Sequence, residues 1–196
     1  MRKGEQTRQG ILETALAEAS MAGLSGLSIG GLANKVAMSK SGLFAHFDSK
    51  QDLQVQVLRT ARELFIEKVI APALQERRGE PRVQALFENW LAWSDSSFLP
   101  GGCPFVSAAT EFDDQPGPLR EYVVQTQQDW LDALATAARI SIEKGHFKTD
   151  LDTERFAFDF HSIILAYYQA TRLLSDPRAT EYCRGAFADL LERSRA

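Results

Sequence analysis

Two short helices separated by only a few residues constrain the fold of this chain more than any other feature. Ser28 is a favourable helix N-cap, and Leu27 before it can pack against Leu32 as a hydrophobic staple. Ser39 begins another helix in the same way, with an apolar Leu43 four positions later. Because so few residues join the two helices, they must cross at a steep angle.

The rest of the chain also carries apolar residues at helical spacing, which predicts an all-α fold. Its 196 residues, 44% of them hydrophobic and 24% charged, are enough to bury a core. Gly23 ends a first helix, and Gly145 is a C-cap for a long one. We find no convincing strand pattern, internal repeat or low-complexity segment. About nine helices are expected, near residues 7–22, 28–36, 39–47, 49–65, 81 to the break at 98–105, 107–112, 119–145, 153–174 and 178–193.

The helix that begins after Ser39 has two chemically different sides. Leu43, Phe44 and Phe47 cluster on one side of its helical wheel, so we expect all three to face inward. The outer side is then small, polar and weakly basic, with Lys40 in the first turn. A backbone that can approach another surface closely suits the DNA major groove, but spacing alone is equally consistent with an ordinary surface helix.

Charge is unevenly distributed and permits a nucleic-acid partner. The chain carries a formal net charge of −4, which would ordinarily argue against DNA. Its first fifty residues hold six Lys or Arg and four Asp or Glu, a net charge of +2. This asymmetry is compatible with a small DNA-facing module on an acidic body, although +2 is modest.

The segment LSIGGLANKVAMSKSGLFAHFDSKQDL, residues 27–53, resembles the helix-turn-helix module of TetR-type transcriptional repressors. Two positions depart from that family: Ala37 stands where Gly is usual in the turn, and Phe44 where many members have a phosphate-binding Tyr. The resemblance implies a DNA-binding domain over residues 1–48 and a ligand-binding and dimerisation domain over 49–196. It also implies a homodimer, formed by a four-helix bundle of the last two helices of each copy, on an inverted-repeat operator. The residues expected to contact DNA are Ser28, Ser39, Lys40, Ser41, Gly42, His46 and Lys50.

The larger predicted domain is rich in aromatic residues and contains all three tryptophans of the chain. Each aromatic residue taken singly is more often part of a core, but their number and the family resemblance favour a small-molecule pocket. No cluster of charges identifies the ligand, so a mostly apolar or aromatic effector is expected. The residues expected to contact it are Trp90, Trp93, Phe98, Cys103, Phe105, Phe112, Trp130, His161 and Tyr167.

Cys103 lies in the irregular segment LPGGCPF, which is similar to a segment in a branch of TetR-type regulators that includes electrophile-responsive members. An electrophilic effector is therefore one reading. The simpler reading is a small buried residue, because no Lys, Arg or His adjoins the thiol to activate it. We interpret Cys183 as a packing residue, and the acidic group at Glu111, Asp113 and Asp114 as a solvated loop.

No other motif indicates catalysis, a cofactor or a metal. The three histidines lie on separate segments, and no nucleophile set, phosphate loop or paired carboxylates appear in a supporting context. Apolar runs are too short to span a membrane, which predicts a cytoplasmic protein. The lack of a catalytic motif predicts that it is not an enzyme. Two alternatives remain: a ligand-binding protein of the same fold that has lost specific DNA binding, and a small all-α enzyme that uses the aromatic cavity.

Overall fold

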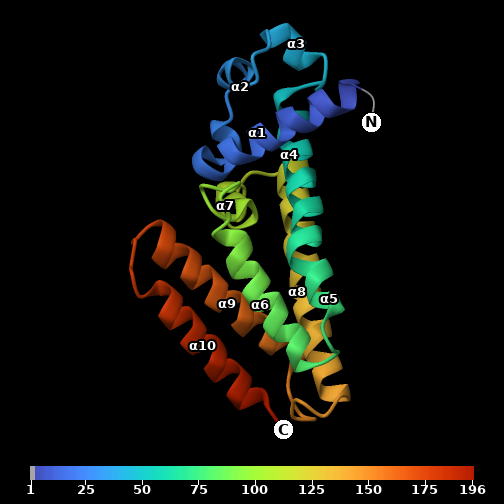
Figure 1. Ribbon diagram of the computed structural model, residues 1–196, viewed down its shortest axis with the longest axis vertical. Helices are drawn as coiled ribbons and strands as arrows, with labels where there is room; N and C mark the ends of the chain where they lie inside the picture. Colours follow the sequence, from blue (N-terminus) through green and yellow to red (C-terminus); the bar gives the residue numbers. More distant parts are fainter. Residues whose placement is uncertain (1–2) are drawn as a thin grey trace. The chain divides into compact units, whose positions relative to one another are not determined.

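The computed structural model describes residues 3–196, which divide into two compact units (Figure 1). Unit 1 contains residues up to 65 together with 95–125, and unit 2 contains 66–94 together with 126–196. The chain therefore passes between the units at three points. This division follows contacts within the chain, and the functional boundary expected after residue 48 remains a prediction.

Both units are built from helices, so the predicted all-α fold is confirmed. Residues 3–196 hold nine helices when α4, the π-helical turn η1 and α5 are taken as one continuous helix, and their only β-type pairing is an isolated bridge between Phe147 and Arg195. No helix among them is long and apolar enough to cross a membrane. Unit 1 contains α1 (Lys3–Gly26), α2 (Ile29–Lys35), α3 (Lys40–Phe44), α4 (Lys50–Phe65), α7 (Pro104–Glu111) and the start of α8 (Pro118–Glu143). Unit 2 contains η1 (Ile66–Ile70), α5 (Ala71–Gln75), α6 (Glu80–Ser94), the remainder of α8, α9 (Thr153–Arg172) and α10 (Ala179–Ser194).

The core of unit 1 forms where α1 packs against α4 and α7. Ile11, Leu12 and Leu16 of α1 are buried, as the helical spacing predicts, and Leu53 of α4 is fully buried. The segment before α7 contacts α1 at Gly101, whose N–H donates to the buried Ser20 hydroxyl at 3.0 Å. Only a residue without a side chain fits there, because a Cβ on residue 101 would lie 1.7 Å from the Ser20 carbonyl oxygen.

Side chains of α4 and α7 hold the segment that joins α1 to α2. Gly23 interrupts α1 with a φ of 74°, in agreement with its predicted role as a helix end. The Glu111 carboxylate accepts hydrogen bonds from the backbone N–H groups of Leu24 and Ser25, and Gln54 of α4 donates to the Leu24 carbonyl at 2.7 Å. Interpreting Glu111 as a solvated loop residue is therefore wrong, since it ends α7 and caps two backbone donors.

Aromatic contacts dominate the core of unit 2. Phe87 of α6 stacks on Phe187 of α10, with ring centroids 3.8 Å apart, and both rings lie near Phe160 of α9. Trp90 meets Tyr167 edge to face at 6.2 Å. These rings join α6, α9 and α10 through large apolar contacts, which are a major source of stability in a helical domain.

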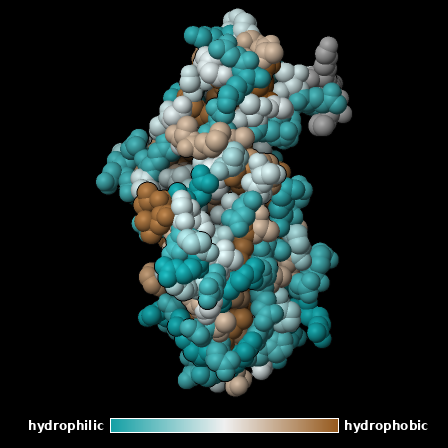
Figure 2. All heavy atoms as spheres, turned by 60° about the vertical axis from the view of Figure 1, so that its left-hand side comes forward, coloured by the Kyte–Doolittle hydropathy of each residue, from teal (hydrophilic) through white to brown (hydrophobic). Residues whose placement is uncertain are grey.

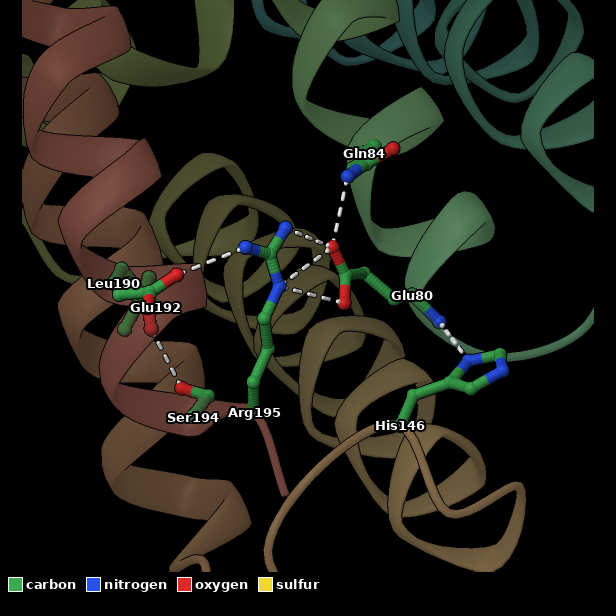
Figure 3. Close-up of polar contacts among 7 residues, drawn as sticks. All are labelled: Glu80, Gln84, His146, Leu190, Glu192, Ser194 and Arg195. Atoms are coloured by element: carbon green, nitrogen blue, oxygen red, sulfur yellow. Dashed lines mark hydrogen bonds and ion pairs between the residues drawn. The ribbon is translucent and has the colours of Figure 1, made fainter.

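Polar contacts tie the C-terminal residues to the start of α6 (Figure 3). The Arg195 guanidinium donates to both oxygens of Glu80 and to Glu192, and these partners raise its pKa. The Glu80 N–H donates to His146 Nδ1 at 3.0 Å. Gly79, with a φ of 105°, lies directly against the same imidazole ring. The loop after α8, the start of α6 and the chain end are thereby joined.

Several element boundaries differ from the sequence-based ones, including those near Ile66 and Pro104. The helix that begins at Lys50 changes to π-helical geometry at Ile66–Ile70, at the point where the chain leaves unit 1. Apolar spacing does not reveal such a change of winding. Helix α7 begins at Pro104 and not near Ser107, because proline is well suited to the first turn of a helix.

Candidate functional site

The two predicted helix caps are confirmed, and they orient α2 and α3. The Ser28 hydroxyl accepts from the Gly31 N–H at 3.2 Å, and the Ser39 hydroxyl accepts from the Gly42 N–H at 3.0 Å. Between the helices, Ala37 has a φ of 53°, which is the left-handed conformation that the usual glycine adopts without cost. The turn therefore keeps the geometry of the motif and stores strain at Ala37.

Replacing Ala37 by glycine is expected to stabilise the protein by about 0.5–1 kcal/mol. Relief of the left-handed strain contributes about 1–2 kcal/mol, and the greater freedom of glycine in the unfolded chain offsets part of it. Thermal unfolding measures the change as a rise of about 1–4 °C in Tm. Ala45→Gly is the matched control, because Ala45 has an ordinary φ of −68° and should lose stability on the same substitution. A lower Tm for Ala37→Gly would contradict strain at this turn.

The outer surface of α3 is small and polar. Lys40, Ser41 and Ala45 are exposed, and Lys40 forms no ion pair among the residues that the structure describes. The Lys40 side chain extends beside α2, where a Cβ on Gly30 would lie 3.1 Å from its Cε. A glycine at position 42 also has a structural role, because a Cβ there would lie 3.2 Å from the capping Ser39 hydroxyl. No Asp or Glu occurs from Ser39 to Phe47, so this surface is uniformly neutral or positive.

Phe44 does not face inward, and the prediction that it does is wrong. Leu43 and Phe47 are buried, whereas 47% of Phe44 is exposed. The helical wheel was misleading because α3 ends at Phe44, and Phe47 lies beyond the helix, after the turn at Ala45 and His46. The wheel therefore grouped a ring at the last helical position with two side chains that point elsewhere. An exposed aromatic ring is thereby added to the surface of α3.

The other residues predicted to contact DNA differ in their hydrogen bonds and in their burial. Ser28 and Ser39 use their hydroxyls as caps, and the Ser39 hydroxyl also forms a 3.1 Å hydrogen bond with the Ser41 hydroxyl. Lys50 donates to the Ser25 carbonyl at 2.8 Å, so it braces the α1–α2 connection. His46 is half-buried beside the Phe47 ring. A contact between these residues and DNA stays a prediction.

The residues expected to line an effector pocket are distributed over both units. Four lie in unit 1, and they are Phe98, Cys103, Phe105 and Phe112. Five lie in unit 2, and they are Trp90, Trp93, Trp130, His161 and Tyr167. In unit 2 the Trp90–Tyr167 contact and the Trp130–Phe160 contact, at 6.1 Å, bring part of the set into one aromatic core.

Two members of this set carry reactive or titratable groups. Cys103 is 2% exposed at the N-cap of α7, in agreement with the simpler reading of a small buried residue. His161 on α9 has a buried Nδ1 without a hydrogen-bond partner among the described residues, and burial lowers the pKa of its imidazole. Neutral His161 is therefore the favoured form in the folded protein.

A cleft that the sequence did not predict opens between α6 and α10. It has a volume of about 580 Å³, and Phe87, Phe187 and Leu191 contribute its apolar part. Arg184, which pairs with Glu88, and Arg195 contribute charged groups to its lining. None of the nine residues expected to contact an effector lines this cleft. Over residues 3–196, no group of three or more His, Cys, Asp or Glu side chains could hold a metal ion.

Comparison with solved structures identifies the same fold in known regulators. A TetR transcriptional regulator from Chloroflexus aurantiacus is 26% identical, with a TM-score of 0.85 over 98% of this chain and 96% of that one. A putative transcriptional regulator from Saccharomonospora viridis, solved in complex with choline, is 22% identical, with a TM-score of 0.82 over 96% of each chain. AibR, solved with isovaleryl coenzyme A and operator DNA, is 21% identical, with a TM-score of 0.76 over 96% of this chain and 99% of that one.

Family models match both parts of the chain. Residues 11–57 match the model of bacterial regulatory proteins of the tetR family, which covers the two capped helices and the start of α4. Residues 79–187, more than half of the chain, match the model of the tetracyclin repressor-like C-terminal domain. A comparison with curated proteins finds no match. With its helix-turn-helix geometry, its all-helical fold and both family models in agreement, the chain belongs to the TetR family of transcriptional regulators.

Proposed function

We propose that this protein is a repressor that binds an inverted-repeat operator as a homodimer and releases it when a small molecule binds. The observation that carries the proposal is the surface of α3, where exposed Lys40 and Ser41 stand on a capped helix without a neighbouring carboxylate. A DNA duplex is a dense polyanion, and a short helix with small outer residues can enter its major groove. AibR, which shares this fold, was solved with operator DNA.

Exposed apolar side chains on α9 and α10 support association of two copies. Phe158 is 63% exposed, and Leu165 lies two helical turns further along the same side of α9. Tyr182 of α10 is also exposed, and Gly185 and Ala186 would let a second helix approach closely. On the face drawn in Figure 2, most of the surface is hydrophilic, with one distinct hydrophobic cluster and smaller hydrophobic areas elsewhere. Large exposed apolar side chains commonly mark a protein interface. A symmetric dimer would space two α3 helices about one DNA turn, or a multiple of it, apart.

The effector is proposed to be a mostly apolar or aromatic small molecule. The aromatic residues of unit 2 and the unpartnered, neutral His161 Nδ1 support a ligand that combines a large apolar surface with one polar group. Related folds were solved with choline and with isovaleryl coenzyme A, so the fold accommodates chemically different ligands. An electrophile acting on Cys103 is less favoured, because that thiol is buried.

Release would follow from a shift between two populations. An effector that binds the DNA-incompetent state more tightly lowers operator affinity by its differential binding energy, typically about 1–3 kcal/mol. Helix α4 belongs to unit 1 and continues as η1, which belongs to unit 2, so it is the connection that we propose carries the change. The π-helical turn there is a local irregularity of the kind often found at functional positions.

Lys40→Ala is expected to weaken specific operator binding by about tenfold or more, because one base or phosphate contact is lost in each half-site. The experiment titrates the full-length protein with DNA that flanks its own gene, at about 0.15 M salt with unrelated competitor DNA, and footprints any complex. Lys35→Ala is the matched control: it removes the same charge, but Lys35 is already paired with Glu18. A protected inverted repeat supports the proposal. Equal binding by wild type and Lys40→Ala would refute this docking, and absence of specific binding would favour a protein that has lost DNA recognition.

A further inference from the structure

Phe44 presents an aromatic ring on the surface that we propose enters DNA. Buried residues hold the chain before and after it, since Leu43 is 1% exposed and Phe47 is 3% exposed. The N-terminus of α3 is fixed by the Ser39 cap. The ring therefore projects from a rigid base, and it would lose little freedom on binding. Its neighbours on the outer side, Ser41 and Ala45, are small and leave the ring accessible.

An exposed phenyl ring can interact with few features of a DNA major groove. Phe44 has no hydroxyl, so it cannot donate a hydrogen bond to a phosphate as a tyrosine could. Base edges in the groove are hydrogen-bond donors and acceptors, with one exception, the 5-methyl group of thymine. A phenyl ring and a methyl group gain free energy when both leave water, whereas a ring placed on a polar edge would bury that edge unsatisfied.

We infer that Phe44 reads the 5-methyl group of a thymine in each operator half-site. This inference rests on the proposed function, because it requires α3 to occupy the major groove. It adds a determinant of specificity that carries no charge and no hydrogen bond. Lys40 and the serine hydroxyls can then position the helix, while the Phe44 ring distinguishes thymine from cytosine at one base pair of each half-site.

Removing only the methyl group tests the inference directly. An operator is first selected from random duplex DNA with the full-length protein. Thymines are then replaced by deoxyuridine, one symmetric pair at a time, and affinities are measured by fluorescence anisotropy. Burial of a methyl group contributes about 0.8 kcal/mol, which corresponds to about fourfold in affinity. We expect one pair whose replacement weakens wild-type binding by about fifteenfold, because both half-sites lose the contact.

The same duplexes are measured with three variants. Phe44→Ala should bind the thymine operator more weakly and should no longer distinguish uracil from thymine at that pair. Phe44→Leu keeps an apolar side chain and should retain part of the discrimination. Met21→Ala removes an apolar side chain that is also about half exposed, from α1, and should behave as wild type. Circular dichroism checks that each variant is folded.

Three outcomes would overturn the inference. Equal wild-type affinity for every uracil-substituted duplex would exclude a methyl contact, while the proposed DNA binding would stand. Undiminished discrimination by Phe44→Ala would assign the methyl contact to another residue, and if that variant also lost affinity equally for the thymine and uracil duplexes, the ring would lie on the sugar–phosphate backbone. Failure to enrich any sequence would overturn the proposed function and this inference together.

Discussion

Replacing Gly101 by alanine is expected to lower the free energy of unfolding by about 3 kcal/mol or more, which is a large effect for a single methyl group. The added Cβ would lie 1.7 Å from the Ser20 carbonyl oxygen and 2.5 Å from the Met21 nitrogen. Both atoms belong to the backbone of α1, so they cannot turn aside as a side chain can. The buried hydrogen bond from Gly101 to the Ser20 hydroxyl would be lost as the segments separate.

Thermal unfolding followed by circular dichroism measures this effect, with an expected fall in Tm of about 6–12 °C. Gly10→Ala is the control, because Gly10 lies in α1 and a Cβ added to it would have no atom within 4 Å. That variant should gain up to about 1 kcal/mol from the higher helix propensity of alanine. If Gly101→Ala melted at the wild-type temperature, the close contact between this residue and α1 would be disproved.

Gly79→Ala is expected to have the second largest effect, a loss of about 2–3 kcal/mol in unit 2. Gly79 has a φ of 105°, a conformation that alanine rarely adopts, and its Cβ would lie 2.2 Å from His146 Nδ1. The imidazole would have to move, and it would then no longer accept the hydrogen bond from the Glu80 N–H. Loss of that contact would also loosen the attachment of Arg195 to Glu80.

A double-mutant cycle separates the two causes of this loss. His146→Ala removes the ring that the new Cβ would meet, so the pair Gly79→Ala and His146→Ala together should cost less than the sum of the two single variants. Urea unfolding of the four proteins gives the coupling energy. The loss of stability that Gly79→Ala causes in the His146→Ala background measures the left-handed strain alone. Strict additivity would show that the imidazole does not obstruct a side chain at position 79.

Local patterns were enough to predict the helices and most of the proposed reading surface. The caps at Ser28 and Ser39 were predictable because a hydroxyl bonds a backbone N–H only two or three residues away. Gly145, with a φ of 71°, ends α8 for an equally local reason. The strain at Ala37 was foreseeable too, since the turn between two capped helices requires a particular backbone conformation.

Several other features depend on residues that are distant in the sequence. From the sequence alone Glu111 is interpreted as a loop carboxylate. In the folded protein it accepts hydrogen bonds from the N–H groups of Leu24 and Ser25. Nothing near Gly101 in the sequence indicates that α1 will lie against it. The charged cleft between α6 and α10 likewise exists only because those helices are neighbours in unit 2.

The amino-acid sequence by itself determined the helical class, the capped helix pair and the family, because these depend on periodicity and on hydrogen bonds within one or two turns. The tertiary structure alone decided which side chains of those helices are exposed. Phe44 shows the reason: its helix is too short for a wheel to define a face, so packing of Leu43 and Phe47 against the rest of unit 1 left the ring outside. Burial is a property of the whole packed unit, and a local pattern cannot supply it.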